Sequence, residues 1–139
     1  MVVKLGDFVL ALRVASADGV CRRPDADEAL PLRWLAPEAL VDGRFSAASD
    51  VWSFGVAFWE VFAGARQPYA GVPAADVGRR VRAGETLPLP VDAPDEAYAL
   101  MRRCWRRRPD RRPTFDAVLA SLLDLRALLR ARPSVSVAL

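Results

Sequence analysis

The stretch SDVWSFGVAFWEVFA, residues 49–63, decides the fold class. Valine, tryptophan and phenylalanine occur at so many of its positions that a helix through it would be apolar on every side. A helix of that kind is normally buried at the centre of a domain. Ser49 is a favourable N-cap for this helix, and Gly64 is a favourable residue for its C-terminal end.

Four further helices are predicted around this central one. The first follows Pro37 and ends near Asp42-Gly43, and the second spans Ala74–Ala83. The third runs from Pro94 to Cys104, and the fourth runs from Thr114 to a point before Pro133. At the front of the chain, residues 1–5 indicate a short strand, and residues 9–30 indicate a loop of more than twenty residues. Long loops in compact domains are usually functional or mobile. The predicted fold is mainly α, with a long loop preceding about five helices.

Composition excludes several classes of function. The 139-residue chain has no histidine and no asparagine, a single lysine (Lys4) and two cysteines, which excludes histidine-based catalysis, histidine-ligated metal and a four-cysteine zinc site. The longest apolar stretch, residues 51–65, is shorter than the roughly 20 residues that span a bilayer. Much of the positive charge lies in residues 102–112, which form either a solvated helix end or a patch for anions or nucleic acid.

Two short motifs stand about thirty residues apart. Asp7-Phe8 follows the short apolar strand, and Ala36-Pro37-Glu38 follows Pro31-Leu32-Arg33-Trp34-Leu35. Together they resemble the activation segment of a protein kinase, and Arg-Trp before Ala-Pro-Glu resembles the tyrosine kinases in particular. The resemblance covers residues 2–130 and continues in order through the following stretches: Ser49–Val56, Gln67-Pro68-Tyr69, Leu100–Trp105 and Arg111–Phe115.

The resemblance implies the C-terminal lobe of a protein-kinase-like fold in residues 1–132, followed by a tail, 133–139. Leu87-Pro88-Leu89-Pro90 is similar to the focal adhesion kinases, whereas Gly64-Ala65-Arg66-Gln67-Pro68 is similar to the discoidin-domain receptor kinases. The subfamily therefore stays open between these two.

At the front of the segment, the resemblance implies roles for three residues. Asp7 matches the aspartate that holds Mg²⁺ on the phosphates of ATP, although by itself it reads equally as a turn aspartate. Phe8 matches the phenylalanine that packs beneath the upper lobe. Val9 stands where the family has glycine, and a β-branched residue is expected to restrict the backbone around Asp7.

Further along, Pro31, Leu32, Arg33 and Trp34 match the segment that receives the residues after a substrate tyrosine. The alternative is that this segment only packs against the helices. Glu38 and Arg112, 74 positions apart, match a buried ion pair that anchors the segment. Asp50 matches an aspartate that accepts backbone hydrogen bonds from the catalytic loop, or it only favours the N-terminus of its helix.

The sequence contains neither the glycine-rich phosphate loop, the ATP lysine nor the catalytic-loop aspartate and asparagine that phosphoryl transfer requires. The expected function is therefore a portion of a tyrosine kinase that is inactive as this isolated chain. ATP and Mg²⁺ would be bound by the complete domain, its partners would be protein substrates, and its location would be cytoplasmic or on the cytoplasmic side of a membrane receptor. The alternatives are a kinase-derived, non-catalytic interaction module, favoured by Val9 and by a loop without tyrosine, and an unrelated helical binding protein, which includes an arginine-patch binder of nucleic acid.

Overall fold

The computed structural model describes residues 4, 6–14, 16–22 and 30–131. The predicted strand at residues 1–5 and the tail at 133–139 lie almost entirely outside the described residues. In chain order, the elements are η1 (Phe8–Leu10), β1 (Val20–Arg22), α1 (Pro37–Asp42), β2 (Arg44–Ser46), α2 (Ala47–Phe62), α3 (Ala74–Arg82), α4 (Asp95–Cys104), η2 (Pro109–Arg111) and α5 (Phe115–Ala131). The described chain is mainly α, as predicted.

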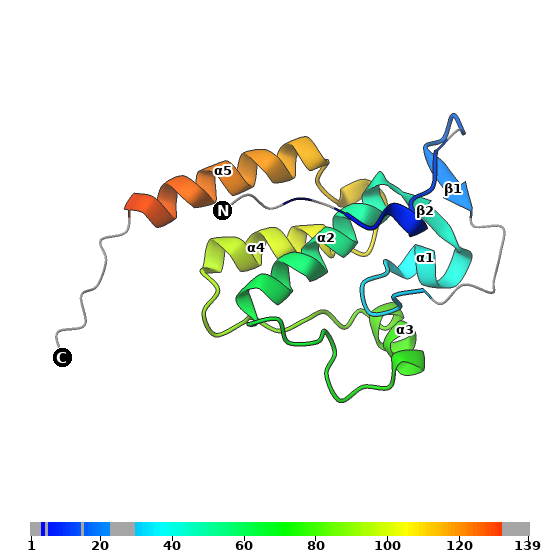
Figure 1. Cartoon of the computed structure of the whole chain (residues 1–139), viewed down its shortest axis with the longest axis horizontal. Helices are drawn as coiled ribbons and strands as arrows, with labels where there is room; N and C mark the ends of the chain where they lie inside the picture. Colours follow the sequence, from blue (N-terminus) through cyan, green and yellow to red (C-terminus); the bar gives the residue numbers. More distant parts are fainter. Residues whose placement is uncertain (1–3, 5, 15, 23–29, 132–139) are drawn as a thin grey trace.

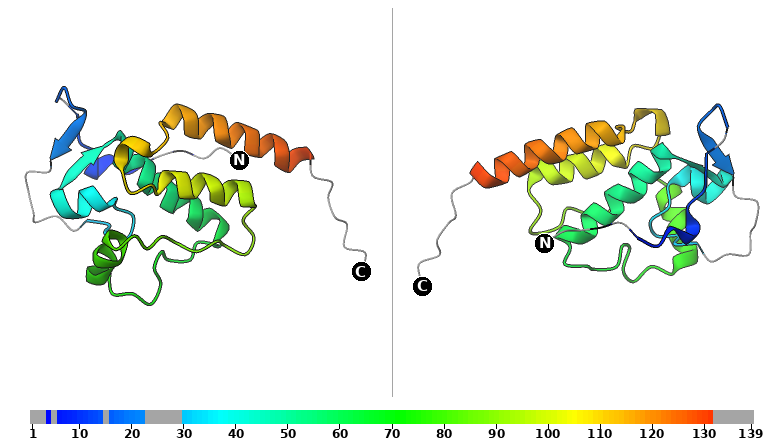
Figure 2. Two further views of the ribbon diagram at one scale, coloured as in Figure 1. Left: turned by 180° about the vertical axis from the view of Figure 1, so that it is seen from behind. Right: turned by 45° about the horizontal axis from the view of Figure 1, so that its top comes forward.

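Helix α2 lies at the centre of the molecule, with α4 beside it and α5 along the outer side of α4 (Figures 1 and 2). Helix α1 and the small sheet gather at the N-terminal end of α2, and α3 lies next to α1. The core between α2, α4 and α5 is formed by Val51, Trp52, Val56, Trp59, Ala97, Leu100, Met101, Cys104, Val118 and Leu125.

One side of α2 is only partly covered by the rest of the described chain. Phe54, Phe58 and Phe62 are only partly buried, and Val61 is 73% exposed. The rings pack on each other instead: Phe54 stacks on Phe58 at 5.7 Å between centroids, and Phe58 meets Phe62 edge to face at 5.2 Å. Within the described residues, α2 is therefore a central helix with one partly open aromatic side.

The predicted N-cap of α2 is wrong by three residues. The helix begins at Ala47, and its N-cap is Ser46, which accepts a hydrogen bond from Ser49 N (3.3 Å). Ser49 occupies the third helical position, and its Oγ accepts from Ser46 N at 2.8 Å. These reciprocal bonds form a capping box. Ala47 and Ala48 are strong helix formers, so the helix extends back to the earlier serine.

The other helix ends follow the predicted signals. Gly43 ends α1, and Gly84 lies directly after the C-cap of α3; both have left-handed or positive-φ backbone that suits glycine. Thr114 caps α5, because its Oγ1 accepts from Ala117 N at 3.3 Å. Pro94 immediately precedes α4.

The two-stranded sheet is not predicted by the sequence. Strands β1 and β2 pair antiparallel, with Cys21 opposite Phe45. Both are three residues long, so neither shows the alternation by which a strand is recognised. The pairing joins the long front loop to Ser46, the residue that also caps α2.

Gly55 of α2 lies closely packed against the C-terminal end of α4. A methyl group added there would lie 2.7 Å from Trp105 Nε1 and 2.8 Å from Cys104 Cβ. We expect Gly55→Ala to lower the free energy of unfolding by about 1–2 kcal/mol, since overpacking outweighs the gain in helix propensity. Urea unfolding measures this change.

Gly78→Ala in α3 is the matched control, because the nearest atoms to an added methyl group there are those of Leu40, at 3.8 Å. We expect that substitution to raise stability by up to about 1 kcal/mol. Equal stabilisation by both substitutions would contradict the close packing at Gly55.

Candidate functional site

The segment before α1 forms a turn that leads into a buried helix start. Trp34 N donates to Pro31 O at 3.0 Å, and Ala36 is fully buried. Pro37 then begins α1, where its missing N–H leaves no intrahelical bond unmade. Pro37 thus fixes the residue at which the segment ends and α1 begins.

Arg33 is bound to a second loop. Its guanidinium donates to the carbonyl oxygens of Pro68 (3.0 Å), Tyr69 (2.9 Å) and Val72 (2.7 Å). Tyr69 in this loop has a left-handed backbone (φ 53°) and is buried, and that burial, with a smaller contribution from Glu85, raises its pKa to about 12. Arg33 therefore holds the 68–72 loop in place, a role that sequence reasoning did not find because the acceptors are backbone atoms.

Trp34 fastens the same segment to the central helix. Its Nε1 donates to Glu60 Oε2 at 2.7 Å, and its carbonyl oxygen accepts from Ser53 Oγ at 2.8 Å. Glu60 carried no sequence signal for this contact, because the two residues are brought together only by the fold. Two of the four predicted substrate-binding residues, Arg33 and Trp34, thus make internal contacts.

Leu32 and Pro31 are placed differently. Pro31 is exposed, and Leu32 lines a hollow of about 200 Å³ between the segment, α1 and α3. The other lining residues are Leu40, Ala74, Ala75, Gly78, Arg79 and Arg82. This hollow offers an apolar wall beside the segment, with two arginines at its edge.

Glu38 and Arg112 form a bidentate ion pair, with Nη1 to Oε1 at 2.6 Å and Nη2 to Oε2 at 2.8 Å. The Arg112 side chain is fully buried, and that of Glu38 is 15% exposed. Arg112 also donates to the carbonyl oxygens of Ala48 (2.9 Å) and Arg106 (2.8 Å), and it lies over the Trp52 ring. One guanidinium therefore links α1, the start of α2 and the loop after α4.

Asp7, Phe8 and Val9 lie at the surface. Phe8 and Val9 are 70% and 77% exposed and belong to the 3₁₀ turn η1. The left-handed backbone falls on Asp7 (φ 59°), whereas Val9 is not among the residues with positive φ. Aspartate tolerates this conformation better than a β-branched residue does. The predicted restriction of the backbone by Val9 stays a prediction.

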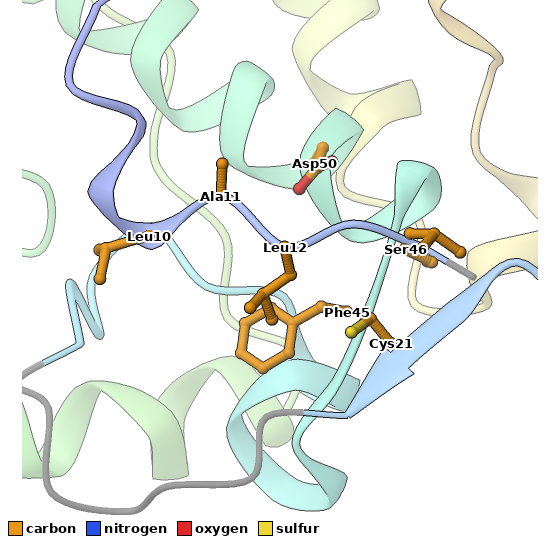
Figure 3. Close-up of a pocket in the computed structure, with 8 residues that line it drawn as sticks. Leu10, Ala11, Leu12, Cys21, Phe45, Ser46 and Asp50 are labelled. Atoms are coloured by element: carbon orange, nitrogen blue, oxygen red, sulfur yellow. The ribbon is translucent and has the colours of Figure 1, made fainter. Parts of the chain in front are cut away.

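Asp50 lies in the first turn of α2, where the helix dipole favours an acid. Figure 3 shows it facing the chain at Ala11 and Leu12, at the edge of a cavity of about 260 Å³ that Cys21 and Phe45 also line. Its side chain remains exposed to solvent on one side, but partial desolvation raises its pKa. Asp50 and the front loop thus meet across this cavity.

The chain matches a known protein family over most of its length. Residues 1–122 match the model of the family described as protein tyrosine and serine/threonine kinase. The chain belongs to this kinase family. The match covers most of the chain, and the observed helices agree with the C-terminal lobe of the kinase fold.

The relatives belong to the tyrosine branch. The chain is 43% identical over 129 residues to protein sevenless of Drosophila virilis, and the aligned region is 93% of this chain and 5% of that protein. It is 43% identical over 125 residues to the tyrosine-protein kinase transforming protein ros of UR2 avian sarcoma virus, covering 90% of this chain and 31% of the viral protein. It is 43% identical over 117 residues to the human proto-oncogene tyrosine-protein kinase ROS, covering 84% of this chain and 5% of that protein.

The chain is therefore a portion of a protein tyrosine kinase, and it spans only a small part of the length of these relatives. Kinases of this family use ATP and Mg²⁺. In the described part of the chain, no three His, Cys, Asp or Glu side chains gather closely enough to hold a metal ion. The residues present do not by themselves fit a Mg²⁺–ATP site, since Asp7 offers one exposed carboxylate. No helix in the described part combines the length and apolar character needed to cross a bilayer.

Proposed function

We propose that this chain supplies the activation segment and the peptide-binding surface of a tyrosine kinase domain. The complete domain would transfer a phosphoryl group from ATP to a tyrosine hydroxyl of a protein substrate. The observation that supports this best is the arrangement around Leu32. Internal contacts of Arg33 and Trp34 hold the segment in place, while Leu32 lines a hollow beside it that also contains Leu40, two alanines and two arginines.

Within that proposal, Pro31 and Leu32 contact the residues that follow the substrate tyrosine, and Arg33 and Trp34 set the shape of the contact surface. Asp7 would contribute one ligand to Mg²⁺, with the remaining ligands and the ATP-binding groups supplied by residues outside this sequence. In this proposal the kinase portion extends over residues 1–132, which the end of α5 at Ala131 supports, and residues 133–139 are the tail that follows it in the sequence. The domain would act in the cytoplasm or on the cytoplasmic side of a membrane receptor.

A non-catalytic interaction module is the second candidate. Two sequence features favour it: Val9 in place of glycine, and a front loop without tyrosine, since Tyr69 and Tyr98 lie elsewhere. In that case the same Leu32 surface would bind a partner protein without phosphorylating it. Magnesium-dependent phosphorylation of a tyrosine peptide by a longer product that contains this chain would exclude this candidate.

The peptide-binding surface is tested by Leu32→Asp. We expect the substitution to weaken binding of a fluorescent tyrosine peptide with apolar residues after the tyrosine by about tenfold, because it replaces the apolar leucine surface with a hydrated carboxylate that Arg79 and Arg82 attract. Fluorescence anisotropy with the purified chain measures the affinity. Leu89→Asp, at an exposed leucine outside the hollow, is the matched control.

Unchanged peptide binding by a folded Leu32→Asp variant would contradict the proposed surface. The purified chain is also expected to transfer no phosphate to the peptide in the presence of Mg²⁺ and ATP. Any magnesium-dependent phosphorylation would show that the chain is active alone.

A further inference from the structure

An arginine-lined hollow lies on the chain between α4 and α5, which includes η2. Its volume is about 480 Å³, and its lining residues are Arg106, Arg107, Arg108 and Arg111. In Figure 1 this loop joins the yellow α4 to the orange α5. The four arginines are exposed, so water and salt screen their charges, but four like charges around one hollow still attract an anion placed among them.

Two of the four guanidinium groups are fixed by the protein. Arg106 Nη1 donates to Arg111 O at 2.8 Å. Arg108 donates from Nε and Nη2 to the two carboxylate oxygens of Asp110, at 3.0 and 2.7 Å. Hydrogen bonding to Asp110 and its negative charge raise the pKa of Arg108.

The guanidinium groups of Arg107 and Arg111 have N–H donors without a hydrogen-bond acceptor among the described residues. Among the described residues, no hydrogen bond is found for the Arg107 side chain, and the Arg111 Nε lies 4.0 Å from Asp110 Oδ2, beyond hydrogen-bonding distance. Asp110 thus supplies the negative charge that is paired within the loop, whereas the four arginines supply four positive charges. The hollow keeps a positive excess. Among the described residues, neither Arg107 nor Arg111 donates a side-chain hydrogen bond, although Arg111 forms a long ion pair with Asp110.

The backbone under these side chains is held in place from below. Buried Arg112 donates to the carbonyl oxygens of Arg106 (2.8 Å) and Arg107 (3.4 Å) while it is paired with Glu38. A loop held this way loses little freedom when a ligand binds, which favours affinity. The backbone beneath the hollow is therefore preorganised.

We propose that this hollow binds the phosphate monoester of a phosphotyrosine side chain on a protein. A guanidinium fork matches the oxygens of a phosphate dianion and forms charge-assisted bonds of the strong class. The hollow is open to solvent, so an aromatic ring can approach together with its phosphate, and guanidinium faces stack on aromatic rings. Recognition of a phosphorylated segment by a cluster of arginines is an established mode of peptide binding.

Nucleic acid fits the same surface less well. Proteins that bind single strands present exposed aromatic rings on which bases stack. The aromatic residue within this stretch, Trp105, is 5% exposed and packs edge to face against Tyr98. The arginines also line one hollow and do not form a groove along which a nucleic-acid backbone could run.

The test uses the full 139-residue chain and a fluorescent phosphotyrosine peptide, compared with the same peptide without the phosphate. We expect the phosphopeptide to bind at least about tenfold more tightly, and the double variant Arg107→Gln/Arg111→Gln to abolish that difference. Neither side chain donates a hydrogen bond that holds the fold, so the variant should remain folded by circular dichroism. Arg126→Gln/Arg130→Gln, which removes the same charge from exposed positions of α5, should retain the difference.

Three results would overturn the proposal. The first is equal binding of the phosphopeptide by the double variant and the unmodified chain. The second is equal affinity for an aspartate-rich peptide of the same charge. The third is displacement of the phosphopeptide by single-stranded RNA at the same concentration of charge, which would identify the hollow as a nucleic-acid site.

Discussion

Replacing Glu38 by alanine is expected to lower the free energy of unfolding by about 3–5 kcal/mol, the largest effect anticipated for a single side chain here. The substitution leaves the Arg112 guanidinium, which is fully buried, without its carboxylate. A buried charge without its partner carries a desolvation cost that the remaining bonds to carbonyl oxygens do not offset. Arg112→Ala should destabilise the chain by a similar amount, because it removes the link between three segments.

Urea unfolding of both single variants and of the double variant measures the coupling between the two residues. Because the two charges share one interaction, the effect of the double substitution should be well below the sum of the single effects. Cleavage by protease between residues 9 and 30 should also become faster in Glu38→Ala, since the pair anchors the segment that follows this loop.

The matched control is Arg108→Ala, which breaks a pair of similar length with Asp110 at the surface. Exposed ion pairs contribute little to stability, so the free energy of unfolding of this variant should be close to that of the unmodified chain. If Glu38→Ala were as mild as Arg108→Ala, the buried pair would not be a significant contribution to stability.

Arg33→Ala is expected to have the second largest effect, a loss of about 2–4 kcal/mol. The substitution removes three charge-assisted bonds from the carbonyl oxygens of residues 68, 69 and 72. The oxygen of Tyr69 keeps its bond from Val72 N, whereas those of Pro68 and Val72 lose the donor that Arg33 supplied. The loop they belong to includes a left-handed tyrosine, a conformation that persists only when its surroundings hold it. Arg33→Lys should recover only part of the loss, because an ammonium group cannot reproduce the planar fork.

Urea unfolding gives the total effect of Arg33→Ala, and amide hydrogen exchange over residues 68–72 gives the local one. Arg66→Ala is the control, since Arg66 makes a single local bond to Ala63 O and should change stability by no more than about 0.5 kcal/mol. Unaltered exchange in the 68–72 loop of Arg33→Ala would contradict the role assigned to Arg33.

Helix positions were predictable because their signals are local. Thr114 and Gly84 act through their own side chain or backbone conformation, and each marks a helix end where the sequence places it. The error at Ser49 has the same origin. Two serines three residues apart can each cap a helix, and only their reciprocal bonding in the folded chain shows which one lies outside it.

The strand pair and the Arg33 contacts were not predictable. Strands β1 and β2 are too short to show a period, and their pairing depends on the path of the chain between them. Arg33 binds carbonyl oxygens, which every residue possesses, so no residue type at positions 68–72 points to it. The resemblance to kinases predicted that Pro31–Trp34 bind substrate together. In the fold, Leu32 lines a hollow, whereas Arg33 and Trp34 make internal contacts.

The sequence by itself determined the class of the fold, the approximate extent of its five helices and the kinase family, because periodicity, capping and motif order are properties of neighbouring residues. Only the tertiary structure decided that Glu38 reaches Arg112 across 74 positions, that Arg112 in turn holds the backbone beneath the arginine-lined hollow, and that Trp34 meets Glu60. These contacts join residues far apart in the chain, and their formation depends on how the helices pack, which no local pattern specifies.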